Sequence, residues 1–186
     1  MPFGYSDGMS QAAQSPTLSF FDAANIDGSI KVMREAVIKG LKDPETRLLA
    51  SCIIGHCDGR HDLCEITAIW DFVQQNVKYV ADPRLVDTFQ TLRRTLQLGF
   101  GDCDDMAIAD ATLLEAIGFQ TYFRVVETKG AGNWNHVYAC VGVPKRAPTS
   151  KLPLDHTLLN AEPGVQPPWS LIQRYKDHQV ITDNWA

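Results

Sequence analysis

The sequence lacks the features that mark membrane proteins, secreted precursors and nucleic-acid-binding proteins. No stretch approaches the roughly 18 consecutive apolar residues that a membrane-spanning helix needs. The first residues, MPFGYSDGMSQAAQSP, contain neither a basic leader nor an apolar segment of the kind found in secretory signals. Lysine and arginine total 17 against 22 acidic residues and form no run, so no nucleic-acid-binding surface is expected. We therefore expect a protein that binds neither membranes nor nucleic acid and carries no secretion signal.

The chain has few cysteines, and their number is odd. The five are Cys52, Cys57, Cys64, Cys103 and Cys140. An odd count, no signal peptide and 45% apolar residues argue against a disulfide framework and predict reduced, buried thiols. In CIIGHCDGRHDLCE, however, Cys57, His61 and Cys64 have the spacing of zinc ligands. His56 or Cys52 would be the fourth ligand, and we keep zinc as the alternative to buried thiols with surface histidines.

Apolar residues recur at helical spacing through the first half of the chain. Residues 1–26 show no period and are expected to form a partly ordered arm. Residues 27–60 are expected to form a helical pair, with Asp43 capping the second helix. In the third helix, HDLCEITAIWDFVQQNVKY, Asp62 and Glu65 form a capping-box pattern. Its predicted buried stripe consists of Leu63, Ile66, Ile69, Trp70, Val73 and Val77.

The second half of the chain changes from helical to strand-like patterning. Residues 80–101 are predicted to be a loop with one short helical turn, followed by a helix at 103–117. FQTYFRVVE, NHVYACVGV and LPLDHTLLN alternate and are rich in β-branched and aromatic residues, which predicts three strands. A short helix at 170–175 is expected within a C-terminal tail, residues 166–186. The order indicates an α+β fold with a core at 61–165, in which the helix beginning at Cys103 packs on an antiparallel sheet.

The segment GDCDD places a thiol at the start of a helix. Free N–H groups and the helix dipole favour a thiolate there. A thiol nucleophile needs a base, and the base needs an orienting group. His136 and Asp155 lie on two successive predicted strands, which could bring both to Cys103. We interpret the flanking acids mainly as helix caps, with Asp102 near the N-cap and Asp105 reaching a free N–H, so the direction of the net effect on the thiol pKa stays open.

His156 follows Asp155 directly. Alternation along a strand places consecutive side chains on opposite faces. We therefore expect His156 to be a surface residue or a rival partner, not a second base.

These segments resemble the transglutaminase-like branch of the papain-like cysteine enzymes. The motifs that carry the resemblance are GDCDDMAIADATLLEAIGFQTYFRVV, NHVYACVGV and LDHTLL, with VQQNVKYVADP upstream. The resemblance implies that Cys103 is the nucleophile, His136 the base and Asp155 the orienting acid. It also implies acyl transfer at an amide or ester through a thioester, without a cofactor.

The resemblance implies groups that would stabilise the oxyanion of the reaction. The backbone N–H of Cys103 is one donor. Gln97, six residues before the cysteine, has a spacing similar to that of the oxyanion glutamine of papain-like proteases. Tyr79 or Trp134 could serve instead, and a surface position for Gln97 is an equal alternative.

Small proteins of this kind are similar to ones encoded by tailed phages and prophages. This implies a location in the bacterial host cytoplasm or the phage virion. We expect a cysteine-dependent hydrolase, a peptidase or amidase, because water is the default acceptor. The alternatives are a non-catalytic module that serves as a structural or assembly component of a phage particle, and a cross-linking transglutaminase. The expected partners are a peptide or protein substrate and phage structural proteins.

Overall fold

The computed structural model describes residues 17–19, 26–59, 61–81, 87–158 and 160–182, and the statements below concern these residues. The helices are α1 (Ile26–Leu41), α2 (Pro44–Ile53), α3 (Asp62–Asn76), α4 (Leu92–Leu98), α5 (Cys103–Ala116) and the 3-10 helix η1 (Trp169–Leu171). The strands are β1 (Thr17–Ser19), β2 (Lys78–Tyr79), β3 (Asp87–Phe89), β4 (Phe100–Gly101), β5 (Thr121–Thr128), β6 (His136–Val143), β7 (Ser150–Leu154) and β8 (Ile172–Gln179). None of the described helices is long and apolar enough to cross a bilayer.

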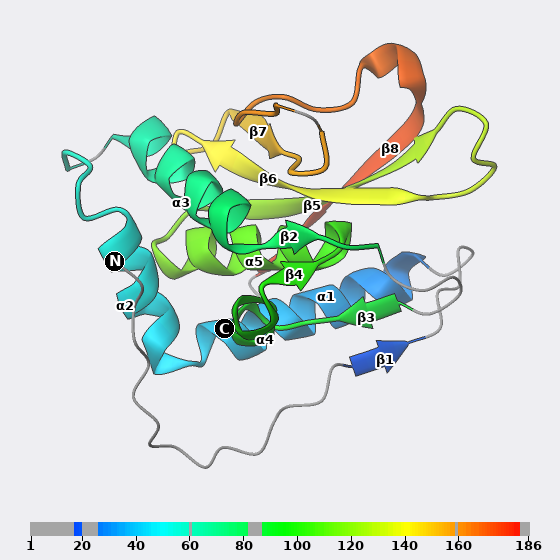
Figure 1. Cartoon of the computed structure of the whole chain (residues 1–186). Coiled ribbons are helices and arrows are strands. Elements are labelled where there is room, and N and C mark those ends of the chain that lie inside the picture. Colours follow the sequence, from blue (N-terminus) through cyan, green and yellow to red (C-terminus); the bar gives the residue numbers. More distant parts are fainter. Residues whose placement is uncertain (1–16, 20–25, 60, 82–86, 159, 183–186) are drawn as a thin grey trace.

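The main sheet has four antiparallel strands in the order β7-β6-β5-β8. His136 at the start of β6 pairs with Val126 on β5, and Ala139 pairs with Leu154 at the end of β7. Two short pairs lie outside this sheet: β1 runs antiparallel to β3, and β2 runs parallel to β4. Figure 1 shows the sheet on one side of α5 and α1 on the other.

Helix α5 is the centre of the core. All eleven residues from 104 to 114 are buried. Small side chains at Ala107, Ala109 and Ala111 let neighbouring elements approach closely. At Gly40 on α1, an added Cβ would lie 2.7 Å from Cγ2 of Thr112, so this helix contact requires glycine. The chain is folded around the helix whose first residue is Cys103.

The predicted α+β fold is confirmed, with the helical elements first and the Cys103 helix packed on an antiparallel sheet. The cap of α2 is also confirmed, because the Asp43 carboxylate accepts the Glu45 N–H at 3.1 Å. The arm at 1–26 lies mostly outside the described residues, so the prediction for it stays a prediction.

The predicted capping box of α3 is wrong. Nδ1 of His61 caps the helix by accepting the Cys64 N–H at 3.0 Å. Asp62 instead accepts the backbone N–H of Lys145 at 2.8 Å, and Glu65 binds the Lys145 ammonium at 2.7 Å. The two carboxylates that local spacing assigned to the end of the helix are therefore bound by Lys145, in a loop far away in the sequence. Leu63, expected in the buried stripe, is 58% exposed.

Two further expectations are corrected by pairing between distant segments. The loop with one short helical turn predicted at 80–101 does contain a short helix, α4, but it also contains the strands β3 and β4. The helix expected at 170–175 is replaced by η1 and β8, and β8 pairs along β5. The C-terminal segment thus completes the main sheet as an edge strand. Local patterning missed it because most of its side chains are polar and half of them are exposed.

A candidate active site at the start of α5

The first turn of α5 is fixed by Asp102 and Gly101. The Asp102 carboxylate accepts the N–H groups of Asp104 and Asp105 at 3.2 and 3.4 Å, which confirms it as the N-cap. An added Cβ at Gly101 would lie 2.6 Å from Cβ of Asp105, so β4 packs directly on this turn. The backbone therefore enters the helix in one defined direction, with Cys103 as the first helical residue.

Asp105 does not cap the helix, contrary to expectation. Its carboxylate accepts the backbone N–H of Gln90 at 2.7 Å and the Gln90 side-chain amide at 2.6 Å. Both residues are buried. Asp105 therefore fastens the segment before α4 to the first turn of α5, a tertiary role that local spacing could not indicate.

His136 and Asp155 form a hydrogen-bonded pair. Nε2 of His136 lies 2.8 Å from Oδ2 of Asp155, and their side chains are 14% and 0% exposed. The other Asp155 oxygen accepts the backbone N–H and the hydroxyl of Thr157 at 3.0 and 2.7 Å. Burial acts to raise the pKa of Asp155, but the hydrogen bonds from His136 and Thr157 outweigh it and hold this pKa below its usual value. Asp155 is thus favoured as a carboxylate, which can accept a hydrogen bond from Nε2 of His136 and leaves Nδ1 as the other ring nitrogen.

The Cys103 thiol is half-buried and lies beside the start of β6. Its pKa is raised well above the usual value by burial and by the negative charges of Asp104 and Asp102. A hydrogen bond with the backbone of Val137, the residue after His136, opposes this rise. The direction left open by the sequence is therefore upward. This direction favours the protonated form of the thiol, which a base would have to deprotonate.

The three predicted oxyanion candidates lie in different surroundings. Tyr79 on β2 is 51% exposed. Its pKa is raised by burial and by the negative charge that Cys103 and Asp102 carry when ionised. Trp134 packs on the core beneath the guanidinium of Arg174, 4.5 Å from its ring centroid. Gln97 is exposed on α4. Tyr79 is thus the candidate with an electrostatic interaction with Cys103, and the oxyanion roles of all three stay predictions.

His156 is not a surface residue. It is 7% exposed, and it is bound to Asp110 on α5 and Gln74 on α3. The prediction that it points away from Asp155 agrees with these separate partners. Its surface placement is wrong, because the side of this segment opposite Asp155 faces α3 and α5 rather than solvent. Asp110 and Gln74 were missed, since each looks like an ordinary helix residue in the sequence.

Two groups of side chains have metal-ligand atoms within 4.8 Å of one another. The first is formed by Asp102, Asp104 and Asp105 in the turn around the thiol. The second is formed by His56, Cys57 and Cys64.

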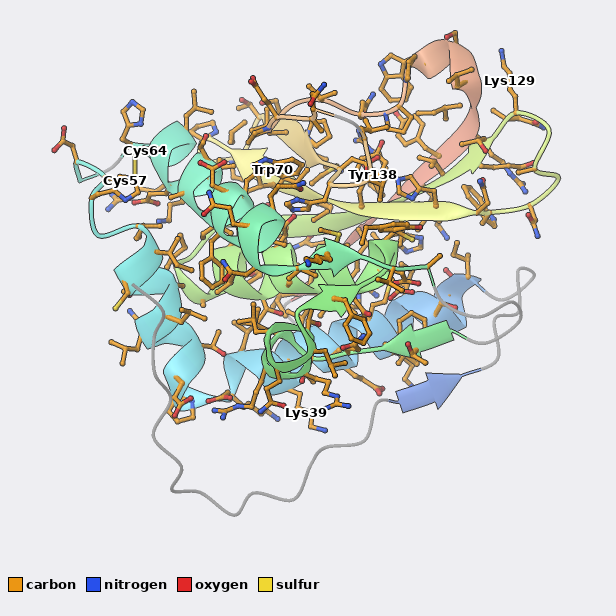
Figure 2. All side chains as sticks on the ribbon, in the orientation of Figure 1. Lys39, Cys57, Cys64, Trp70, Lys129 and Tyr138 are labelled. Atoms are coloured by element: carbon orange, nitrogen blue, oxygen red, sulfur yellow. A yellow bond between two sulfur atoms is a disulfide. The ribbon has the colours of Figure 1, made fainter. Side chains whose placement is uncertain are left out.

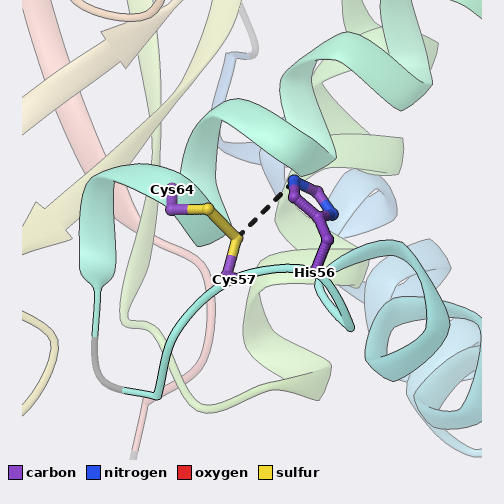
Figure 3. A group of neighbouring side chains, drawn as sticks. All are labelled: His56, Cys57 and Cys64. Carbon is purple, nitrogen blue, oxygen red and sulfur yellow. Dashed lines mark hydrogen bonds between the residues drawn. A yellow bond between two sulfur atoms is a disulfide. The ribbon is translucent and has the colours of Figure 1, made fainter.

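The expectation of reduced thiols is wrong for Cys57 and Cys64, which form a disulfide (Figures 2 and 3). His56 Nε2 lies 3.9 Å from Cys57 Sγ, and His61 is the cap of α3. While the disulfide holds, neither sulfur is a thiolate, so the predicted zinc set of Cys57, His61 and Cys64 cannot form. Cys140 is buried and reduced as predicted, whereas Cys52 is reduced but exposed.

The fold and this site define a class of protein: a papain-like α+β chain with a thiol at a helix N-terminus beside a histidine–carboxylate pair, the layout of cysteine-dependent hydrolases and acyltransferases. The family follows from the sequence comparison. The transglutaminase-like superfamily model matches residues 54–147, just over half of the 186 residues, and the chain belongs to this superfamily. The predicted family is therefore confirmed. The match includes Cys103 and His136, whereas Asp155 lies beyond its end.

Solved structures give weaker likenesses. A protein of Parabacteroides distasonis provisionally assigned as a protease has 14% identity and a TM-score of 0.48, over 74% of this chain and 32% of that one. A provisionally assigned cysteine protease of Cytophaga hutchinsonii has 16% identity and a TM-score of 0.48, over 88% of this chain and 60% of that one. LapG of Legionella pneumophila has 19% identity and a TM-score of 0.46, over 69% of this chain and 73% of that one.

The chain thus spans less than two thirds of the length of the first two proteins. No curated protein sequence matches the chain.

Proposed function

We propose that the protein is a cysteine-dependent hydrolase that cleaves an amide or ester, with Cys103, His136 and Asp155 as its catalytic residues. One observation carries the proposal: His136 and Asp155 form a hydrogen-bonded pair, 2.8 Å apart, and the Cys103 thiol is hydrogen-bonded to the backbone of Val137, the residue next to His136. An oriented base next to a thiol at a helix N-terminus is what acyl transfer through a thioester requires.

In the first half of the reaction, His136 accepts the thiol proton on Nδ1 as Cys103 attacks the substrate carbonyl. A carbon–sulfur bond forms, and the carbonyl oxygen becomes an oxyanion. Asp102 already binds the N–H groups of residues 104 and 105, so the Cys103 N–H is the first-turn donor left for that oxygen. The Tyr79 hydroxyl is the second proposed donor.

Collapse of the intermediate breaks the bond to the leaving group, which takes the proton from His136. Water then attacks the thioester and gives one proton to His136. The carbon–sulfur bond breaks, the acid is released, and the thiol regains the proton. Asp155 stays ionised throughout, because its lowered pKa favours the carboxylate, and it stabilises the imidazolium each time it forms.

Hydrolysis is preferred to cross-linking because water is the default acceptor for a thioester. An intact set of Cys103, His136 and Asp155 also argues against a non-catalytic module, which would usually have lost one of the three. A peptidase or amidase activity and a phage or prophage source, with the protein in the host cytoplasm or the virion, stay parts of the proposal.

An activated ester tests the proposal without knowledge of the natural substrate. Incubated with p-nitrophenyl acetate, the protein should release more than one equivalent of nitrophenolate and carry a transient acetyl group on Cys103, detected by peptide mass spectrometry. Cys103→Ala and His136→Ala should abolish turnover, whereas Cys52→Ser, which removes an exposed thiol, should not. Turnover that survives Cys103→Ala would overturn the proposal. Adding a primary amine separates hydrolysis from transfer, since a transferase would form the amide in preference to acetate.

A further inference from the structure

His156 forms a second histidine–carboxylate pair immediately after Asp155. Its Nε2 lies 2.8 Å from Oδ2 of Asp110, and the two side chains are 1% and 0% exposed. Its Nδ1 lies 2.8 Å from Oε1 of Gln74, and its ring stacks on Trp70 with the centroids 3.6 Å apart. Trp70 lies where α3 faces the sheet layer (Figure 2). The imidazole is therefore held on both ring nitrogens and on one face.

The partners of His156 come from two helices, while its backbone belongs to the segment that follows β7. Trp70 and Gln74 are on α3, and Asp110 is on α5. The peptide bond between Asp155 and His156 joins this anchor to the carboxylate that orients His136. Any shift of His156 between the helices would move Asp155 with it.

Helix α5 supplies both the nucleophile and the anchor. Cys103 and Asp110 are seven residues apart on it, which places them on the same face, about 10 Å apart along the axis. Because an α-helix is rigid over two turns, the spacing between the thiol and the Asp110 carboxylate is fixed. Because the Asp110–His156 hydrogen bond holds His156 in place, Asp155, the residue before it, is also held at a fixed distance from the thiol.

Asp110 has no alternative partner in the described part of the chain. Its Oδ1 is buried without a hydrogen bond, so its hydrogen bonding is directed to His156. Burial raises the pKa of Asp110, and His156 acts against that rise. A buried carboxylate with a single partner strongly favours one position of that partner.

We propose that His156 is a positioning residue, which Asp110, Gln74 and Trp70 hold in place. Through its backbone it fixes the positions of Asp155 and His136 relative to Cys103. This inference rests on the proposed function and adds to it a residue that touches neither the thiol nor the substrate. Its action is indirect: it fixes the place of the acid that fixes the base.

The test compares acylation of Cys103 by p-nitrophenyl acetate in variants of the full chain. His156→Gln removes the ring stack and the pair with Asp110, and we expect acylation at neutral pH to fall about 10- to 100-fold, because a displacement near 1 Å has such effects. The fall should shrink at alkaline pH, where the thiolate forms without His136. Asp110→Asn should act in the same direction. Gln74→Ala changes an exposed side chain, should not prevent folding, and should give a smaller fall.

Glu115→Gln is the matched control. Glu115 lies at the other end of α5 and accepts two hydrogen bonds from Thr121, at 2.9 and 2.7 Å. This variant should lose stability but keep the wild-type pH profile of acylation. The Nε2 proton signal of His136 in NMR spectra gives a second readout, which should shift in His156→Gln and stay in place in Glu115→Gln.

The outcomes separate this inference from the proposed function. A wild-type protein acylated at Cys103, together with His156→Gln and Gln74→Ala proteins that are acylated equally fast and keep the His136 signal, would overturn the positioning role alone. A wild-type protein that is not acylated at Cys103 would overturn the proposed function, and the positioning role with it.

Discussion

Two consecutive residues, Asp155 and His156, form two histidine–carboxylate pairs with the same 2.8 Å separation and different surroundings. In the first pair the histidine, His136, is 14% exposed and stands beside a thiol. In the second pair the histidine is 1% exposed and lies between helices. The same two groups are thus placed once with the histidine partly open to solvent and once fully enclosed between helices.

The carboxylates of the two pairs also differ in the direction of their pKa shifts. Burial alone would raise both. Hydrogen bonds from His136 and Thr157 lower the pKa of Asp155, whereas Asp110 has one partner among the described residues and its pKa stays raised. The number of donors around a buried carboxylate therefore decides which form it favours. A carboxylate that must stabilise an imidazolium during a reaction is best served by the first arrangement.

The largest expected effect comes from Asp155→Asn. The amide would turn the imidazole into the wrong tautomer and remove the charge that stabilises the imidazolium, so turnover of an ester substrate should fall by about 10³- to 10⁴-fold. The measurement is steady-state turnover, with thermal unfolding to confirm that the variant is folded. A loss smaller than about tenfold would mean that the His136–Asp155 pair is not catalytic.

The second prediction concerns stability, for which the His156–Asp110 pair should matter more than the His136–Asp155 pair. His156→Ala leaves a buried carboxylate without a partner and should lower the free energy of unfolding by about 3–5 kcal/mol. His136→Ala should cost only about 1–2 kcal/mol, because Asp155 keeps both hydrogen bonds from Thr157. Urea unfolding followed by circular dichroism compares the two. Equal losses would show that the pairs are not divided into a catalytic and a structural one.

The smallest effect is the pH dependence of stability. A lowered folded-state pKa means that Asp155 contributes stability above its unfolded pKa and loses it as the pH falls through the folded value. Asp110, with a raised pKa, does the reverse: its contribution is full below its unfolded pKa and is lost as the pH rises through the folded value.

Unfolding free energies across the acid range therefore provide the third test. Asp155→Asn should weaken the loss of stability on acidification, and Asp110→Asn should make that loss steeper. The same sign of change in both variants would contradict the assigned pKa directions.

Much of this arrangement could be predicted from local sequence. The helix at Cys103, its cap at Asp102 and the strand that begins at His136 all follow from spacing between near neighbours, which is where local rules are strong. The fold class followed from the order of these elements.

The features that sequence reasoning missed depend on contacts between distant segments. Lys145 binds the carboxylates of Asp62 and Glu65, and Gln90 donates hydrogen bonds to Asp105. The polar strand β8 pairs with β5, which lies far from it in the sequence. The burial of His156 has the same cause, since periodicity gives the face of a side chain but not what covers that face.

A crystal structure of the protein trapped with a peptide aldehyde tests the central claim most directly. The account predicts a hemithioacetal on Sγ of Cys103, with its oxygen bound by the Cys103 N–H and the Tyr79 hydroxyl. His136 should face the sulfur through Nδ1 while Nε2 stays bound to Asp155, and His156 should stay on Asp110. An adduct on Cys52, or one on Cys103 with His136 turned away from the sulfur, would contradict the account.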